Sequence, residues 1–189
     1  IARIAANTPN LPGVSVEQGL SRVYPSFESY AHVVGYVGPV SDSDLKKGDE
    51  NDPLLKIPRF QVGKVGIEKH YEDILRGSAG VMKVEVNALG RVMRNLDRKE
   101  GKPGNNIQLT VDTELQSYIQ ARLGSESASA VVMNCKNGEI LAIASSPSYD
   151  PNKFVKGISY SDFNELRDNV FRPLASKTVQ DAYPPGSTF

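Results

Sequence analysis

The chain has 189 residues and no formal net charge, because 22 lysines and arginines balance 22 aspartates and glutamates. Hydrophobic residues make up 39% of it and charged residues 23%, which is typical of one or two globular domains rather than a disordered or membrane-embedded chain. The charge balance argues against a nucleic-acid binder, which would show a basic excess or patch. A single cysteine, Cys135, excludes an internal disulfide and a multi-cysteine metal site.

Residues 1–104 are dense in glycine and proline between short strand-like runs, which predicts a β-rich region with many turns. Alternating apolar residues predict a half-buried strand over 81–89, paired through a turn at Gly90-Arg91 with a second strand over 92–96. The other elements expected here are a strand over 30–40 with turns at Gly35 and Gly38, a solvated loop or short capped helix over 42–53, and a helix over 66–75 that stops at Gly77.

A linker-like stretch over 97–106 separates this region from a second one. Two apolar runs, 128–133 and 139–144, are joined by Asn137-Gly138, the dipeptide most typical of a tight hairpin. The remaining expected elements are a strand over 107–111, a helix over 113–123, a loop over 145–152 and a helix over 160–167.

The last nine residues read DAYPPGSTF. Pro185 and Gly186 predict a tight turn that places Ser187 at the start of a helix, where its own amide could bind an oxyanion. A nucleophilic serine needs a base, and a lysine three residues later would lie on the same helix face. Taken alone, however, these residues are more typical of a loop that leads into a helix N-cap.

The chain resembles the class B penicillin-binding proteins in several long blocks, in the right order. YPPGSTF is similar to the nucleophile segment of that family, which continues to the lysine of an S-x-x-K motif. The other similar blocks are residues 130–154, which resemble the opening hairpin of the transpeptidase domain, and 11–25, 31–41, 63–80 and 84–94, which resemble the non-catalytic pedestal. Within the family, the wording is most similar to the elongation-specific transpeptidases, the penicillin-binding protein 2 group, and the division-specific relatives are the alternative.

The resemblance implies an α+β fold, with a pedestal (dimerisation) domain over 1–104 and the incomplete N-terminal part of a β-lactamase-like α/β transpeptidase domain over 105–189. It implies a peptidoglycan D,D-transpeptidase that uses Ser187 as its nucleophile, cross-links stem peptides and is acylated by β-lactams, with no metal or organic cofactor. The implied partners are a SEDS-type glycan polymerase and an MreC-type scaffold. The implied location is the bacterial inner membrane, crossed once, with this region in the periplasm.

Some family features are missing from the sequence. The lysine of S-x-x-K, an S-x-N motif, a K-T-G motif and a membrane-spanning segment are not found, and Lys177-Thr178 is followed by Val179. We therefore expect an excised piece that is inactive alone and not acylated stoichiometrically by penicillin. A pedestal that acts purely as a binding module is the second hypothesis, and an unrelated cytosolic β-rich domain is the third.

Arg22 and Glu68 lie in the second and third pedestal motifs of the resembled family. We expect them to meet as a largely buried ion pair near the junction with the catalytic domain, so that loss of one partner costs roughly 3–5 kcal/mol. The alternative is two independent surface charges.

Several other polar residues have a plain structural interpretation. We expect structural or surface roles for both histidines and for the thiol. A solvated helix face, or one structural pairing, is favoured over a pair of catalytic carboxylates, and a solvated loop over a partner site. The residues concerned are His32, His70, Cys135, the pair Glu68 and Glu72, and Lys46-Lys47 within the charged run 42–52.

Overall fold

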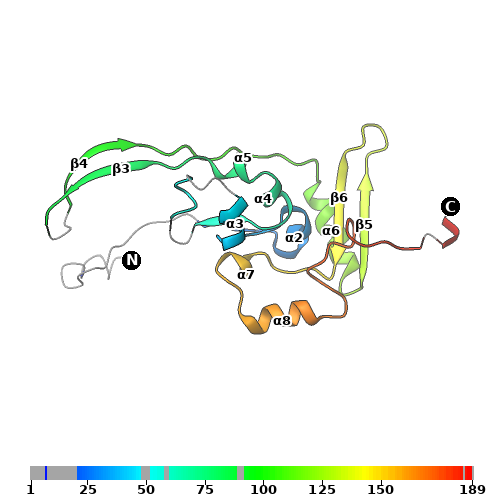
Figure 1. Ribbon diagram of the computed structural model, residues 1–189. Coiled ribbons are helices and arrows are strands. Elements are labelled where there is room, and N and C mark those ends of the chain that lie inside the picture. Colours follow the sequence, from blue (N-terminus) through cyan, green and yellow to red (C-terminus); the bar gives the residue numbers. More distant parts are fainter. Residues whose placement is uncertain are drawn as a thin grey trace.

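The computed structural model of the chain describes residues 7, 21–47, 52–57, 60–88, 92–184 and 186–188. These residues form the expected mixed α+β structure, in which the strands make three separate two-stranded antiparallel sheets. Figure 1 shows a long hairpin reaching out on one side of the body and a second hairpin standing on the other. The helices lie between and below these two hairpins (Figure 1).

The prediction of a strand over 30–40 is wrong for the first half of this segment. It begins with the 3-10 helix η2 (Phe27–Tyr30) and the helix α2 (Ala31–Val34), and only β1 (Val37–Pro39) is extended. Ala31 is fully buried in a core cluster with Tyr149, and this packing outweighs the strand preference of the valines that follow. Gly35, with φ +79°, ends α2, and a Cβ there would lie 2.0 Å from the Val65 carbonyl oxygen.

The charged run after β1 contains the helix α3 (Asp42–Lys47), one of the two structures expected for it. Ser41 precedes α3, and its amide donates to Asp44 Oδ2 at 2.8 Å, as in a capping box. Residues 48–51 of this run lie outside the described residues. The strand β2 (Gln61–Gly63) then pairs with β1.

The helix expected over 66–75 is present but divided. Tyr71, with φ −109° and ψ 25°, separates α4 (Gly66–His70) from α5 (Glu72–Arg76). Gly77 ends α5 with φ +73°, as predicted.

The long hairpin is formed by β3 (Val81–Val86) and β4 (Val92–Lys99), so the predicted pairing is confirmed. The turn predicted at Gly90-Arg91 lies outside the described residues. The prediction of a half-buried strand is wrong, because only Val84 of β3 is partly buried. The ribbon projects away from the body, so described elements do not cover either of its faces (Figure 1).

The second hairpin and its helix form as predicted. The helix α6 (Thr113–Leu123) begins at Asp112, whose carboxylate accepts from the Leu115 amide at 2.8 Å. It packs on β6 (Ile140–Ser146), which pairs with β5 (Ala128–Met133). Apolar area is exposed on β5, where Val131 is 49% and Met133 53% exposed.

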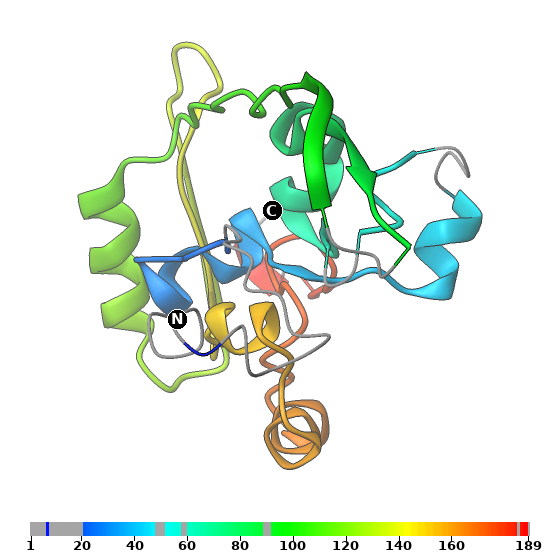
Figure 2. The ribbon, with the colours of Figure 1, turned by 90° about the vertical axis from the view of Figure 1, so that its left-hand side faces the viewer.

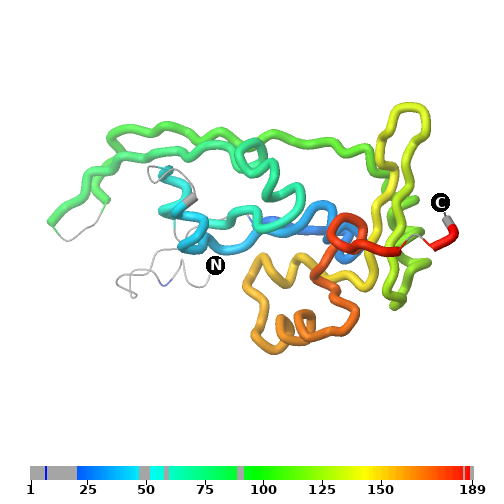
Figure 3. The backbone as a smooth tube through the Cα atoms, turned by 45° about the vertical axis from the view of Figure 1, so that its right-hand side comes forward, coloured from blue at the N-terminus to red at the C-terminus, as the bar shows by residue number. Residues whose placement is uncertain are grey.

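The prediction of a strand over 107–111 is wrong. Residues 103–109 have no regular structure, and the segment is attached to β6 by two contacts beside its end. Thr110 Oγ1 donates to the Ile140 carbonyl at 2.7 Å, and the Asp112 amide donates to the Leu141 carbonyl at 2.8 Å. Figure 3 shows this segment running from the long hairpin toward α6.

Two short helices follow β6. The expected loop over 145–152 is shorter, because Ser145 and Ser146 belong to β6 and Asn152 begins α7 (Asn152–Val155). The predicted last helix is α8 (Tyr160–Asp168), capped by the Ser159 hydroxyl.

The core joins the two sequence regions. One cluster combines Tyr24 and Val37 with Val155, and the other combines Ala31 with Tyr149 and Phe154. Figure 2 shows α2 between α6 and α7, which places the first region against the second. The division into domains 1–104 and 105–189 therefore stays a prediction. Both clusters of the packed core contain residues from each side of this boundary.

Candidate functional site

Ser187 lies in the 3-10 turn η3 (Gly186–Thr188), where its φ is −89° and its ψ is 21°. The preceding Gly186 takes φ +61°, the left-handed geometry of a tight turn. Ser187 is exposed, and within the described part of the chain its hydroxyl has no hydrogen-bond partner. Pro185, part of the predicted turn, lies outside the described residues.

Arg22 and Glu68 are brought together. Arg22 Nε lies 2.7 Å from Glu68 Oε1, and Nη2 donates to Oε2 at 2.9 Å, so the guanidinium contacts both oxygens of the carboxylate. The side chain of Glu68 is only 5% exposed, but that of Arg22 is 41% exposed. The pair is thus buried on its acidic side alone, which corrects the expectation of a largely buried pair.

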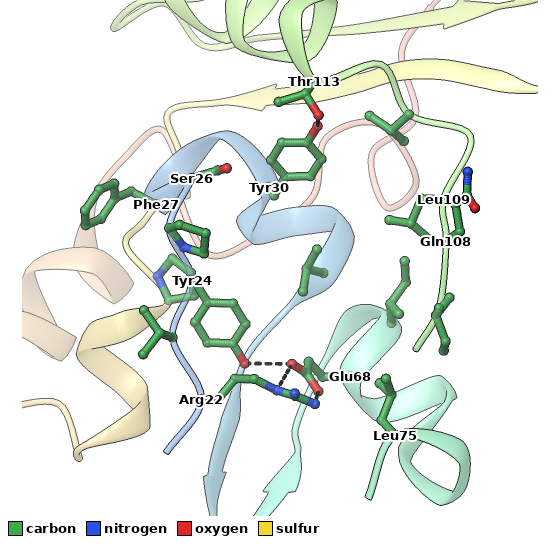
Figure 4. A pocket seen from close by; sticks show the side chains of 17 residues that line it. Arg22, Tyr24, Ser26, Phe27, Tyr30, Glu68, Leu75, Gln108, Leu109 and Thr113 are labelled. Atoms are coloured by element: carbon green, nitrogen blue, oxygen red, sulfur yellow. Dashed lines mark hydrogen bonds and ion pairs between the residues drawn. The ribbon is translucent and has the colours of Figure 1, made fainter. Parts of the chain in front are cut away.

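Tyr24 completes this group, as Figure 4 shows. Its hydroxyl donates to Glu68 Oε1 at 3.2 Å and accepts from the Val37 amide at 2.9 Å. Burial, and then the nearby charge of Glu68, raise the pKa of the Tyr24 phenol well above its ordinary value. Burial alone would lower the pKa of Arg22, but the hydrogen bond and charge of Glu68 raise it. Arg22 therefore stays a cation and Tyr24 a neutral phenol at ordinary pH.

Glu68 and Glu72 do not act as a pair of catalytic carboxylates. Glu68 is occupied by Arg22, and Glu72 Oε2 accepts from the Gly63 amide at 2.7 Å. Burial raises the pKa of Glu72, and the hydrogen bond from Gly63 opposes that shift. Glu72 therefore fixes the chain at the end of β2.

His32 lies in α2 with its ring edge-on to Tyr149, at a centroid distance of 5.3 Å. Burial and the charge of Lys177 lower the pKa of His32 to about 4. His70 is exposed beside Tyr71. Neither histidine has metal-ligand neighbours, since the described residues hold no cluster of three or more His, Cys, Asp or Glu that could bind a metal ion.

Cys135 is exposed in the turn between β5 and β6. In the charged run, Asp44 forms an ion pair with Lys64, and Lys46 is exposed. No described contact joins the thiol or Lys46 to the sites above.

Sequence reasoning missed two amide side chains that fasten the two regions together. Asn152 accepts from the Tyr24 amide and donates to the Tyr24 carbonyl, both at 2.9 Å, so it pairs with Tyr24 as a neighbouring strand would. Gln116, fully buried in α6, donates to the carbonyls of Ser29 and Ile143 and accepts from the Ile143 amide. The one signal in the sequence for this role of Gln116 is its position on the apolar face of the predicted helix.

Lys177 was noted only as part of a failed K-T-G match. It is 3% exposed, and its Nζ has no hydrogen-bond partner among the described residues. Burial lowers its pKa. Its amide donates to Ser145 Oγ at 3.1 Å, which attaches the segment before Ser187 to β6.

Two protein-family models match this chain. The penicillin-binding protein dimerisation domain matches residues 1–109, and the penicillin-binding protein transpeptidase domain matches residues 128–189. The chain belongs to the penicillin-binding proteins. Ser187 thus lies inside the transpeptidase match, whereas Arg22 and Glu68 lie inside the dimerisation match.

Curated relatives among the penicillin-binding proteins include the peptidoglycan D,D-transpeptidases MrdA of Acinetobacter baumannii and Escherichia coli, each 41% identical over 100% of this chain. Penicillin-binding protein 3 of Bacillus subtilis is 35% identical over 98% of it. The chain spans only 28% and 30% of the length of the two MrdA relatives.

Two solved structures share the fold. Penicillin-binding protein 2 of Helicobacter pylori, in a complex with MreC, matches 98% of this chain and 34% of its own with a TM-score of 0.82 and 34% identity. Penicillin-binding protein 2 of Pseudomonas aeruginosa, in complex with WCK 5153, matches 93% of this chain and 34% of its own with a TM-score of 0.74 and 37% identity. In the described part of the chain, no helix is long and apolar enough to cross a membrane.

Proposed function

We propose that the protein is a peptidoglycan D,D-transpeptidase of cell-wall elongation. The observation that supports this most is the match to two MrdA transpeptidases along the full length of the chain, with Ser187 inside the transpeptidase region. The exposed position of Ser187 after the Gly186 turn suits a nucleophile that must meet a large substrate.

In the proposed reaction, the hydroxyl oxygen of Ser187 attacks the carbonyl of the penultimate D-Ala of a stem peptide. The backbone amide of Ser187 helps to hold the oxyanion that forms. The peptide bond to the terminal D-Ala breaks, D-Ala leaves with the proton on its amine, and an acyl ester stays on Ser187. An amine of a neighbouring stem then attacks the ester, which forms the cross-link and restores the serine hydroxyl. β-Lactams acylate the same oxygen by opening their ring.

We further propose that the region 1–104 is a pedestal that binds an MreC-type scaffold and a SEDS-type polymerase. The Helicobacter pylori relative was solved with MreC, and this chain matches that relative over 98% of its length. The proposed location is the inner membrane, with this chain in the periplasm and an anchor in another part of the protein. No cofactor is needed for the acyl-transfer chemistry.

Acylation of the whole protein by fluorescent penicillin tests the enzymatic proposal. The Ser187→Ala variant should lose covalent label to the background level, while the matched control Ser125→Ala, at another exposed serine, should keep it. Equal labelling of Ser187→Ala and the unchanged protein would refute the assignment of the nucleophile.

A division-specific transpeptidase is the alternative within the family. A fluorescent fusion of the whole protein in a rod-shaped bacterium separates the two, because an elongation enzyme should lie along the side wall. Accumulation at the septum alone would favour the division-specific role. If Ser187→Ala keeps MreC binding and full cell-shape function, the chain acts as a binding module instead.

A further inference from the structure

A cavity of about 560 Å³ is lined mostly by residues of the dimerisation match, and Ser187 is not among the residues that line it. Most of its lining comes from three segments far apart in sequence: residues 22–34, the helices α4 and α5, and residues 107–113, which lead into α6. Pro151, just before α7, completes it. Figure 4 shows the Arg22–Glu68 pair at one end and the Tyr30–Thr113 hydrogen bond at the other. A volume of this size is ordinary for sites that bind small molecules.

The walls between these ends are mostly aliphatic. They are lined by Val34, Ile67, Leu75, Ile107, Leu109 and Val111. Such walls favour an apolar body of a ligand, because burying apolar surface is the main favourable contribution there.

Arg22 and Glu68 carry opposite charges, but they are not equally available to a ligand at the polar end of the cavity. Both oxygens of Glu68 are already occupied, and its side chain is 5% exposed, so it offers little to a cationic ligand. Arg22 is 41% exposed, and its partner among the described residues is Glu68, which it contacts through only two of the three nitrogens of a guanidinium with five N–H groups. The open group at this end is therefore a guanidinium with N–H donors to spare, which suits an anion.

We propose that this cavity binds a small amphiphilic molecule with an apolar body and one anionic end that contacts Arg22. The ligand would touch both the pedestal helices and the segment that leads into α6, so it would hold these elements together. This inference does not depend on the transpeptidase activity, since Ser187 is not among the residues that line the cavity.

The fluorescent amphiphile anilinonaphthalene sulfonate is a suitable probe, because it joins an aromatic body to a single sulfonate. We expect saturable binding of one molecule per chain. Leu109→Trp, which fills the cavity from an irregular segment, should weaken binding about tenfold or more. Leu96→Trp on the exposed β4 is the matched control and should leave binding unchanged. Ile107→Trp replaces Leu109→Trp if thermal unfolding shows that the latter is not folded.

The uncharged analogue phenylnaphthylamine tests the role of Arg22. It should bind about tenfold more weakly than the sulfonate, because it loses a charge-assisted hydrogen bond. The proposal is overturned if the probe does not bind, if Leu96→Trp rather than Leu109→Trp abolishes binding, or if both probes bind equally tightly.

Discussion

At the scale of single residues, the ion pair of Arg22 and Glu68 is unequal. Glu68 is enclosed by protein, but the guanidinium of Arg22 still reaches water. The consequence of losing each partner therefore differs, because a stranded charge is costly only where solvent cannot replace its partner.

This inequality gives a testable prediction. Arg22→Met should lower the free energy of unfolding by about 3–5 kcal/mol, because it leaves the buried carboxylate of Glu68 without a cation. Glu68→Gln should cost only about 1–2 kcal/mol, because its amide oxygen can still accept hydrogen bonds and Arg22 can turn to water. Urea unfolding of both variants measures the difference, and a larger loss for Glu68→Gln would contradict it.

The lowered pKa of His32 leads to a prediction of how the free energy of unfolding depends on pH. Its pKa in the folded protein is about 4, below its ordinary value of 6.5, so the folded state takes up a proton less readily than the unfolded state. The contribution of His32 is therefore full above pH 6.5 and is lost as the pH falls toward 4, by about 3 kcal/mol in total. In His32→Phe, unfolding measured between pH 7 and pH 4 should lose less stability than in the unchanged chain.

The exposed His70 provides the control for this measurement. His70→Gln should keep the pH dependence of the unchanged chain. If His32→Phe and the unchanged chain lose stability in parallel, His32 is not the source of the dependence.

The residues of the candidate site could be predicted from the sequence only where they belong to a motif. Ser187, Arg22 and Glu68 were found in this way, and the structure brings the last two into contact. Asn152, Gln116 and Lys177 were not found, because their roles depend on which distant backbone groups they meet. No periodicity in the sequence carries that information.

At the scale of elements, α6 is attached to the rest of the molecule through Gln116. Gln116→Leu should cost about 3 kcal/mol, because it leaves the Ile143 amide and two partly buried carbonyls without these partners. Gln120→Leu, one turn further along α6, is the control. It should cost less than about 1 kcal/mol, since Gln120 makes one long bond of 3.4 Å to the Ser145 carbonyl.

Thermal or urea unfolding of these two variants measures the contrast. Equal losses would mean that general packing of α6, rather than the hydrogen bonds of Gln116, determines its attachment.

Element predictions succeeded where the local pattern and the tertiary environment agree. The helix α6 has a capping aspartate and an apolar face, and the β5–β6 hairpin has its Asn-Gly turn. They failed where packing decides, as in residues 31–34, which are helical because Ala31 is enclosed by Tyr149 and Phe154. They failed also in 107–111, which contacts β6 by isolated hydrogen bonds rather than a ladder.

At the scale of the whole molecule, the two family matches do not correspond to two independent cores. Both described core clusters contain residues from each side of residue 105. The backbone of Tyr24 is paired by Asn152, and the buried Gln116 reaches the Ser29 carbonyl. The pedestal and the first part of the transpeptidase region are therefore expected to unfold together.

The shared core also restricts how this protein can be recombined with its relatives. A chimera joined at residue 104 would place Tyr24 and Ala31 of one parent against Asn152 and Tyr149 of the other. Since these contacts are specific in shape and hydrogen bonding, a crossover that respects the sequence families would still divide the core. A compatible exchange has to carry residues 21–37 together with Gln116 and residues 143–155.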